Sequence, residues 1–203
     1  MVAAAVLAGG ASRRMGRDKA TLAVGGVELA SVALAAAARV AAPVVLVAPE
    51  GHPARRLTAA PVTDPGLGPL AAVAAALGAL EAEHVLVLAG DHPGLRVELL
   101  AHLVALAPRG DAVACRRGPR LEPLVAVYRR IPALAAARRA LPGGSGGHKP
   151  RPPENRGSLL GLLAELRTVV VEEPDWRALD PDGRSFVDLD DPGDVAAWQA
   201  GRR

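Results

Sequence analysis

The residues best suited to chemistry follow the first apolar run directly, in the stretch "VLAGGASRRMGRDK" (residues 6–19). The adjacent glycines Gly9 and Gly10 let backbone amides approach a polyanion closely, and amides clustered in this way bind anions. Arg14 and Lys19 add positive charge within reach of phosphate oxygens. Lys19 is unusual in this chain, because 22 of the 24 basic residues are arginines. We therefore expect a loop that binds a phosphorylated ligand, with an ordinary surface lysine as the alternative reading of Lys19.

The glycine spacing of this stretch, G-G-x(5)-G, differs from that of the two best-known phosphate loops. Dinucleotide loops read G-x-G-x-x-G and P-loops read G-x(4)-G-K-[ST], so a dehydrogenase and a P-loop enzyme are disfavoured. A secretory signal is also disfavoured, because the apolar run Val2–Ala8 is very short and the arginines follow it. No window approaches the length of a membrane span. We expect a cytoplasmic protein that does not bind membranes.

A second chemical group ends an uninterrupted hydrophobic run in "HVLVLAGDHPGL" (residues 84–95). The run delivers Asp91 at its end, and a carboxylate so placed suits Mg²⁺, which takes few protein ligands and fills its shell with water and phosphate oxygens. His92 is adjacent, but a transition-metal site would need further ligands, and the sequence indicates none. His84 is interpreted as a surface or helix residue. The stretch thus predicts a magnesium site at Asp91.

Three further aspartates have two readings each. Asp64, in "TDPGLGPLAAV", could bind a hydroxyl or amine of a ligand, or it could form a turn. Asp188 and Asp190 are two apart in "FVDLDDPGDV", so on a short strand they would share one face. They could provide a second metal ligand beside Asp91, or they could repel each other and stay solvated.

The elements that must position these residues alternate between short apolar runs and Ala/Leu-rich stretches. Expected strands are Val2–Leu7, Val44–Ala48, Pro61–Thr63, His84–Ala89, Ala112–Cys115, Leu124–Tyr128, Thr168–Glu172 and Phe186–Leu189. Expected helices are Val27–Ala41, Pro69–Leu80, Val97–Ala107, Ile131–Leu141, Ser158–Leu166 and Pro192–Gln199. This alternation, with strands hydrophobic on both faces, predicts an α/β fold in three layers (α/β/α) with a mainly parallel sheet. Ligands bind beyond the carboxyl ends of such strands.

Composition narrows the class of protein. The chain has 203 residues, of which 50% are hydrophobic, and this predicts one domain over residues 1–203. The Gly/Pro-rich stretch at about residues 141–157 is expected to be a flexible loop, and its basic residues could also fold over an anion. The basic residues are scattered among 21 carboxylates, which argues against nucleic acid as a partner. Cys115, the single cysteine, excludes an internal disulfide and is expected to be an inert buried thiol.

Taken together, these segments resemble the MobA-like nucleotidyltransferases, and within them most closely the molybdenum cofactor guanylyltransferases. The opening is similar to the family signature L-A-G-G-x-S-x-R-M-G-x-D-K, through Leu7, Ala8, Gly9, Gly10, Ser12, Arg14, Met15, Gly16, Asp18 and Lys19. Later stretches add to the likeness: "GPLAAV" at 68–73, "AGDHPGL" around Asp91, "EPLVAVY" at 122–128, "GSLLGLL" at 157–163 and "DLDDPGDV" at 188–195.

The resemblance implies a Rossmann-like nucleotidyltransferase fold, also called the nucleotide-diphospho-sugar transferase fold, and a reaction. Mg²⁺ would sit at Asp91, with Asp188 and Asp190 as a further ligand source. GTP would lie over the first loop, where Arg14 and Lys19 hold the triphosphate. Leu7, Ala8, Gly9, Gly10 and Asp64 would complete the nucleotide site. The phosphate of molybdopterin, held near Glu122 and Ser158, would attack the α-phosphorus and release pyrophosphate.

The nucleotide and the acceptor both have alternatives. The "LAGG" form and the space left by Gly10 favour a purine base, whereas related cytidylyltransferases carry "LAAG". Val47-Ala48-Pro49 stands where guanylyltransferases often have an asparagine, and the late aspartates resemble a form common among cytidylyltransferases, so CTP is the alternative. Another phosphorylated small molecule could be the acceptor. A nucleotide-binding accessory protein without turnover is the non-enzymatic alternative. Transient contact with molybdoenzyme chaperones or other cofactor-biosynthesis proteins would follow from the family role.

Overall fold

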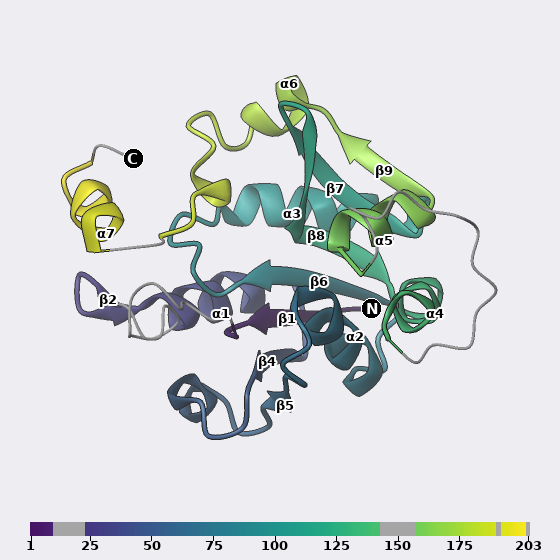
Figure 1. Cartoon of the computed structure of the whole chain (residues 1–203). Helices are drawn as coiled ribbons and strands as arrows, with labels where there is room; N and C mark the ends of the chain where they lie inside the picture. The colour runs from purple at the N-terminus through teal and green to yellow at the C-terminus, as the bar shows by residue number, and fades with distance from the viewer. Residues whose placement is uncertain (10–22, 143–156, 190–191, 202–203) are drawn as a thin grey trace.

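A single large sheet forms the centre of the molecule (Figure 1). The computed structural model describes residues 1–9, 23–142, 157–189 and 192–201. Within these ranges the sheet has the strand order β5-β4-β1-β6-β8-β7-β9. Its strands are β1 (Val2–Leu7), β4 (Val44–Ala48), β5 (Val62–Thr63), β6 (His84–Ala89), β7 (Ala112–Arg117), β8 (Arg120–Arg129) and β9 (Thr168–Val171).

The sheet is mainly parallel, as the sequence predicts. β5, β4, β1 and β6 run parallel to one another, and β7 runs parallel to β9. Only β8 is antiparallel to its neighbours β6 and β7 in this sheet. The carboxyl ends of β5, β4, β1 and β6 therefore meet at one edge, here called the carboxyl edge.

Helices cover both faces of the sheet and complete the three layers. One face carries α1 (Leu29–Ala38) and α3 (Val97–Leu106), and the other carries α2 (Pro69–Ala79), α4 (Arg130–Ala140) and α5 (Leu159–Glu165). The short helix α6 (Glu173–Arg177) and α7 (Pro192–Gln199) follow β9. Within the described ranges, short 3₁₀ segments lie at Pro53–Leu57, Ala107–Arg109 and Arg184–Phe186. No helix in the described ranges combines the length and the hydropathy needed to cross a membrane.

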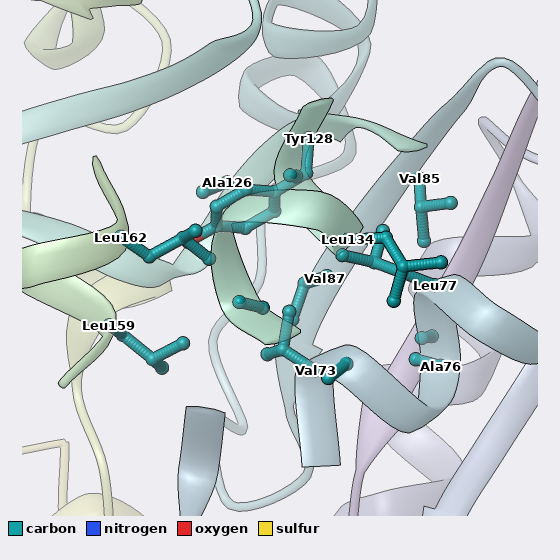
Figure 2. Close-up of a cluster of buried hydrophobic side chains, with 14 of the residues drawn as sticks. Val73, Ala76, Leu77, Val85, Val87, Ala126, Tyr128, Leu134, Leu159 and Leu162 are labelled. Atoms are coloured by element: carbon teal, nitrogen blue, oxygen red, sulfur yellow. The ribbon is translucent and has the colours of Figure 1, made fainter. Parts of the chain in front are cut away.

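Alternate residues of each strand enter opposite cores, because successive side chains of a strand point to opposite faces. In β6, Val85 and Val87 face α2 and α4, whereas Leu86 and Leu88 face α1 and α3. Figure 2 shows the first of these cores. There Tyr128 is fully buried, and its hydroxyl donates to the carbonyl oxygen of Pro123 at 2.8 Å. Both faces are thus hydrophobic, which is why the strands lack in/out alternation.

The structure departs most clearly from the sequence-based elements at the expected helix Val27–Ala41 and the expected strand Phe186–Leu189. The helix expected at Val27–Ala41 begins at Leu29, because β3 (Val27–Glu28) pairs with β2 (Ala23–Val24) in a hairpin. Gly25 and Gly26 form its turn with φ of 59° and 83°, a conformation that favours glycine. The strand expected at Phe186–Leu189 is wrong, since the 3₁₀ turn Arg184–Phe186 and an extended segment without ladder pairing occupy this region.

Candidate active site

The carboxyl edge brings several of the predicted site residues together. The backbone N–H of Ala8 donates to the Val47 carbonyl oxygen of β4 at 2.8 Å, and the N–H of Gly90 donates to the Leu7 carbonyl oxygen at 2.8 Å. The end of β1 is thereby held between the ends of β4 and β6. Leu7 and Ala8 are buried, with exposed fractions of 8% and 3%. They contribute backbone to this edge rather than exposed side chains.

Glycines allow the loops at this edge to approach closely. A Cβ atom on Gly90 would lie 2.9 Å from the Leu7 carbonyl oxygen, so Asp91 follows a residue packed directly onto β1. A Cβ atom on Gly9 would overlap Oδ2 of Asp64. Only a residue without a side chain fits at these two positions without displacing a neighbour. The edge is therefore a surface of closely spaced backbone groups with a carboxylate directly against Gly9.

Asp64 forms a turn, which is one of the two readings considered for it in the sequence. Its backbone N–H donates to the Ala48 carbonyl oxygen at 3.0 Å, and its Oδ1 accepts from the N–H of Gly66 at 2.9 Å, which is a turn-forming contact. Its other oxygen, Oδ2, faces Gly9. One carboxylate oxygen thus fixes the loop and the second faces the chain that enters the predicted phosphate-binding stretch. Contact of Asp64 with a ligand stays a prediction.

Asp91 lies two residues beyond the end of β6, after Gly90, and 26% of its side chain is exposed. The Nε2 atom of His92 lies 3.8 Å from its Oδ1. His92 is buried, and its Nδ1 has no hydrogen-bond partner within the described ranges. A partly exposed carboxylate oxygen at a strand end fits a hard cation such as Mg²⁺, which takes one or two protein carboxylates and otherwise water and phosphate.

Of the late aspartates, the structure describes Asp188, which lies near the same region. The N–H of Leu189 donates to the carbonyl oxygen of Asp91 at 3.3 Å, so the exposed Asp188 is next in sequence to a residue bonded to the candidate metal loop. The strand that was expected to place Asp188 and Asp190 on one face does not form over residues 186–189, and Asp190 itself lies outside the described residues. Gly10, Arg14 and Lys19 also lie outside them. The described side chains hold no group of three His, Cys, Asp or Glu suited to a metal.

The residues predicted to hold the acceptor have local partners. Oε1 of Glu122 on β8 accepts from Nε of Arg117 at 2.6 Å, across the turn that joins β7 to β8. Oγ of Ser158 accepts from the N–H of Gly161 at 3.0 Å and so caps the first turn of α5. These contacts account for both side chains locally, and their role toward an acceptor stays a prediction.

One cation at the carboxyl edge was missed by the sequence analysis. Nη1 of Arg55 donates to the Ala48 carbonyl oxygen at 2.9 Å and lies 3.5 Å from Oγ1 of Thr63. The guanidinium is thereby fixed at the ends of β4 and β5, beside Asp64. The stretch "PARRL" contains no motif that predicts this contact. The position of Arg55 depends on how the 3₁₀ segment Pro53–Leu57 packs against the ends of β4 and β5.

Cys115 and His84 are buried ionisable groups outside this edge. Cys115 is fully buried in β7, and burial raises the pKa of its thiol to about 12, which confirms an inert, uncharged thiol. His84, at the start of β6, has an exposed fraction of only 6%, so its interpretation as a surface or helix residue is wrong. Burial lowers the pKa of His84, and this effect outweighs the nearby charge of Glu83.

Comparison with known proteins gives a consistent family assignment. Residues 4–149 match the model of the MobA-like NTP transferase domain. A Chloroflexus aggregans protein named "Probable molybdenum cofactor guanylyltransferase" is 34% identical over 208 aligned residues, covering 98% of this chain and 94% of that protein. A protein of the same name from Opitutus terrae is 37% identical and covers 87% of this chain and 88% of its own length.

Solved structures agree with this assignment at the level of the fold. Molybdopterin-guanine dinucleotide biosynthesis protein A from Archaeoglobus fulgidus superposes with a TM-score of 0.77 at 25% identity, covering 98% of this chain and 97% of that one. A cytidylyltransferase for 2-C-methyl-D-erythritol 4-phosphate from Thermus thermophilus superposes with a TM-score of 0.64 at 22% identity, with 97% and 96% covered. The three-layer fold is therefore that of the nucleotide-diphospho-sugar transferases. Because the family model matches residues 4–149, well more than half of the chain, and the Chloroflexus aggregans relative aligns along nearly all of it, the chain belongs to the MobA-like NTP transferases and is a nucleotidyltransferase.

Proposed function

We propose that this nucleotidyltransferase transfers GMP from GTP to the terminal phosphate of molybdopterin and releases pyrophosphate. The observation that carries the proposal is the likeness to the Chloroflexus aggregans guanylyltransferase, which extends over 98% of this chain. A likeness along nearly the whole chain includes both the predicted nucleotide-binding residues and the predicted acceptor residues Glu122 and Ser158. The product would be a guanine dinucleotide form of the molybdenum cofactor, made in the cytoplasm.

The geometry of the carboxyl edge supports a reaction of this type. Gly9 packs against Asp64 and Gly90 against the Leu7 carbonyl oxygen, so backbone of this edge would lie near the phosphates of a bound nucleotide, and Asp91 presents a partly exposed carboxylate just beyond β6. Asp91, with Asp188 or Asp190, would hold Mg²⁺, which neutralises charge on the phosphates when it is bound. Arg14 and Lys19 would hold the triphosphate in line with the acceptor. Nucleotidyl transfer needs positioning and charge neutralisation more than a nucleophilic side chain.

The choice of GTP over CTP is part of the proposal. Because glycine has no side chain, Gly10 would leave space for a purine, and the relatives that align along the chain carry the guanylyltransferase name. The likeness to the Thermus thermophilus cytidylyltransferase concerns the fold alone, because it is only 22% identical.

The direct experiment is a comparison of nucleotides by pyrophosphate release. Purified protein with Mg²⁺ and molybdopterin should release pyrophosphate from GTP far faster than from CTP. Equal rates or a preference for CTP would contradict the guanylyl assignment. Release from GTP with another phosphorylated acceptor, but not with molybdopterin, would contradict the acceptor. Tight binding of GTP without any turnover would favour the accessory-protein alternative.

A further inference from the structure

A second carboxylate, Asp180, occupies an unusual place for a charged residue. It follows α6 and is fully buried. A carboxylate removed from water is costly unless hydrogen bonds and opposite charges compensate it. The groups that bind the buried Asp180 carboxylate are therefore held firmly in place.

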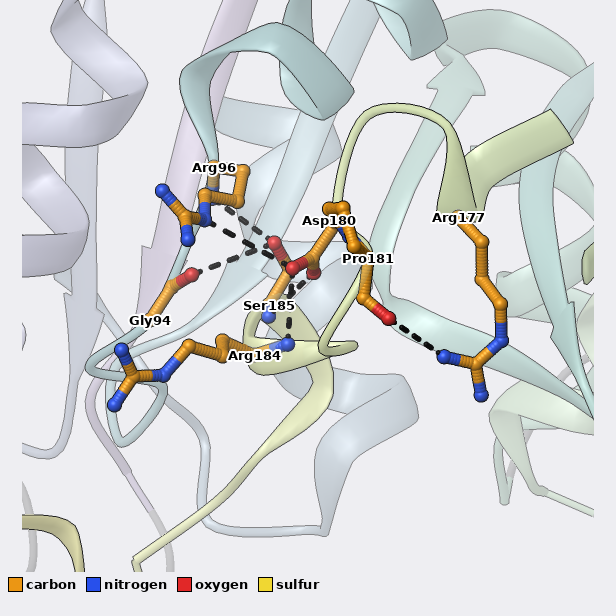
Figure 3. A network of polar contacts seen from close by, with 7 residues as sticks. All are labelled: Gly94, Arg96, Arg177, Asp180, Pro181, Arg184 and Ser185. Carbon is orange, nitrogen blue, oxygen red and sulfur yellow. Dashed lines mark hydrogen bonds and ion pairs between the residues drawn. The ribbon is translucent and has the colours of Figure 1, made fainter. Parts of the chain in front are cut away.

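Both carboxylate oxygens of Asp180 bind the 3₁₀ turn Arg184–Phe186. Oδ1 accepts from the backbone N–H of Arg184 at 3.0 Å, and Oδ2 accepts from the N–H of Ser185 at 2.8 Å. Nε of Arg96, at the start of α3, lies 3.9 Å from Oδ1. Figure 3 shows Asp180 between the turn and Arg96. These bonds explain why Phe186–Leu189 does not begin a strand.

The 3₁₀ turn Arg184–Phe186 also binds the segment that follows Asp91. Oγ of Ser185, itself fully buried, accepts from the backbone N–H of Arg96 at 2.9 Å and donates to the Gly94 carbonyl oxygen at 3.5 Å (Figure 3). Gly94 packs against the turn so closely that a Cβ atom there would lie 2.5 Å from the Arg184 carbonyl oxygen. A few residues later, Leu189 donates to the Asp91 carbonyl oxygen at 3.3 Å.

These contacts fix the loop from Asp91 to Arg96, here called the Asp91 loop, at its beginning, middle and end. The partner in each case lies between residues 184 and 189, and the carboxylate of Asp180 organises the start of that segment. We infer that Asp180 and Ser185 are positioning residues for Asp91: they hold the Asp91 loop so that the Asp91 carboxylate stays aimed at the carboxyl edge. The inference rests on the proposed function only for what Asp91 binds.

Ser185 offers the sharper test, because its hydroxyl joins the turn to the Asp91 loop while the bonds of Asp180 to the turn use backbone N–H groups. Ser185→Ala should therefore release the loop and leave the turn formed. Ser31→Ala is the control, since Oγ of Ser31 also bonds to backbone, donating to the Glu28 carbonyl oxygen at 2.7 Å, in a different part of the molecule. Asp180→Asn is the second variant, because an amide nitrogen cannot accept one of the two N–H bonds. Its control is Asp175→Asn at an exposed site.

Two measurements separate positioning from a general loss of stability. Hydrogen exchange should accelerate in peptides that cover residues 91–96 in Ser185→Ala and Asp180→Asn, but not in peptides of β1, and not in the control variants. Mn²⁺ binding in the presence of GTP, followed by electron paramagnetic resonance, should weaken about tenfold or more, the usual effect of losing a group that supports a metal ligand. The melting temperature provides the check on overall stability.

The outcomes distinguish this inference from the proposed function. Unchanged exchange at residues 91–96 in Ser185→Ala, relative to Ser31→Ala, would overturn the positioning role, whatever the nucleotide. Faster exchange at these residues with unchanged Mn²⁺ affinity would also overturn it, because the loop would move without consequence for Asp91. If the wild-type protein binds no Mn²⁺ with GTP, the proposed function fails, and the exchange experiment still decides whether Asp180 and Ser185 hold the loop.

Discussion

The two edges of the central sheet are built in different ways. At the carboxyl edge, Gly9 packs against the side chain of Asp64, which can move if its neighbour grows. At the opposite, amino edge, a Cβ atom on Gly110 would lie 2.6 Å from the backbone carbonyl oxygen of Arg167, which cannot move without moving β9. At Gly110 the close packing is against backbone and fixes the fold, whereas at Gly9 it is against a side-chain carboxylate beside the predicted phosphate-binding stretch.

The largest expected effect on activity comes from replacing an aspartate at the carboxyl edge, compared with one at the amino edge. Asp91→Asn keeps the size of the side chain and removes its charge, so we expect pyrophosphate release to fall below detection while the melting temperature changes little. Asp111→Asn at the amino edge, where Asp111 lies 4.0 Å from Arg129 in a half-exposed pair, should keep full activity. Normal turnover of Asp91→Asn would remove Asp91 from the metal site.

A second comparison uses the two glycines. In Gly9→Ala the new methyl group should displace the Asp64 carboxylate. We therefore expect nucleotide affinity, measured by calorimetry, to fall about tenfold, which corresponds to a loss of about 1.4 kcal/mol of binding free energy. The free energy of unfolding should change little. In Gly110→Ala the clash is with backbone, so the free energy of unfolding should fall by about 1–3 kcal/mol with nucleotide affinity retained. Equal effects of both variants on both measurements would erase the distinction between the edges.

The buried His84 at the amino edge predicts a dependence of stability on pH. Burial lowers its pKa in the folded state below the ordinary 6.5, so the unfolded chain binds the proton more readily. Neutral His84 therefore contributes to the stability of the fold above pH 6.5, and this contribution is lost as the pH falls from 6.5 through the pKa of the folded state. Urea unfolding on either side of 6.5 should therefore show a weaker pH dependence for His84→Gln than for the wild type. If the free energy of unfolding depended on pH equally in both proteins, His84 would not be the source of this pH dependence.

The smallest effect is expected for the exposed charges of the amino edge. Arg129 lies 3.3 Å from Glu83, with both side chains about half exposed. Arg129→Ala should change the free energy of unfolding by less than about 1 kcal/mol and leave turnover unchanged, because such pairs are screened by solvent. A large loss of activity in this variant would mean that the amino edge also takes part in function.

Local signals predicted much of this fold, and tertiary contacts explain what they missed. β1, β4 and β6 were predicted with their observed bounds, because both faces of these runs are hydrophobic and Gly or Pro ends them. The hairpin around Gly25 and Gly26 was missed although its Gly-Gly turn is a usable signal. The strand at Phe186–Leu189 was wrong because Asp180, five residues before Ser185, bends the chain through its buried carboxylate.

The candidate site divides in the same way. Asp64 and Asp91 were found by looking where hydrophobic runs end, since parallel strands deliver their following residues to one edge. Arg55 and Ser185 were missed, because neither follows a strand directly. Their positions depend on contacts with Ala48 and with Arg96, which are distant in sequence or lie across a loop. Such residues become visible only when the elements have been assembled.

The central claim, guanylyl transfer at the carboxyl edge, is tested most directly by following the phosphates of GTP. With molybdopterin and Mg²⁺, a label on the α-phosphorus should appear in a product that contains molybdopterin and GMP, and a label on the γ-phosphorus should appear in pyrophosphate. The Asp91→Asn protein should give neither. If the γ-label is released as inorganic phosphate, or if the α-label stays on a free guanine nucleotide, the chain does not catalyse this transfer.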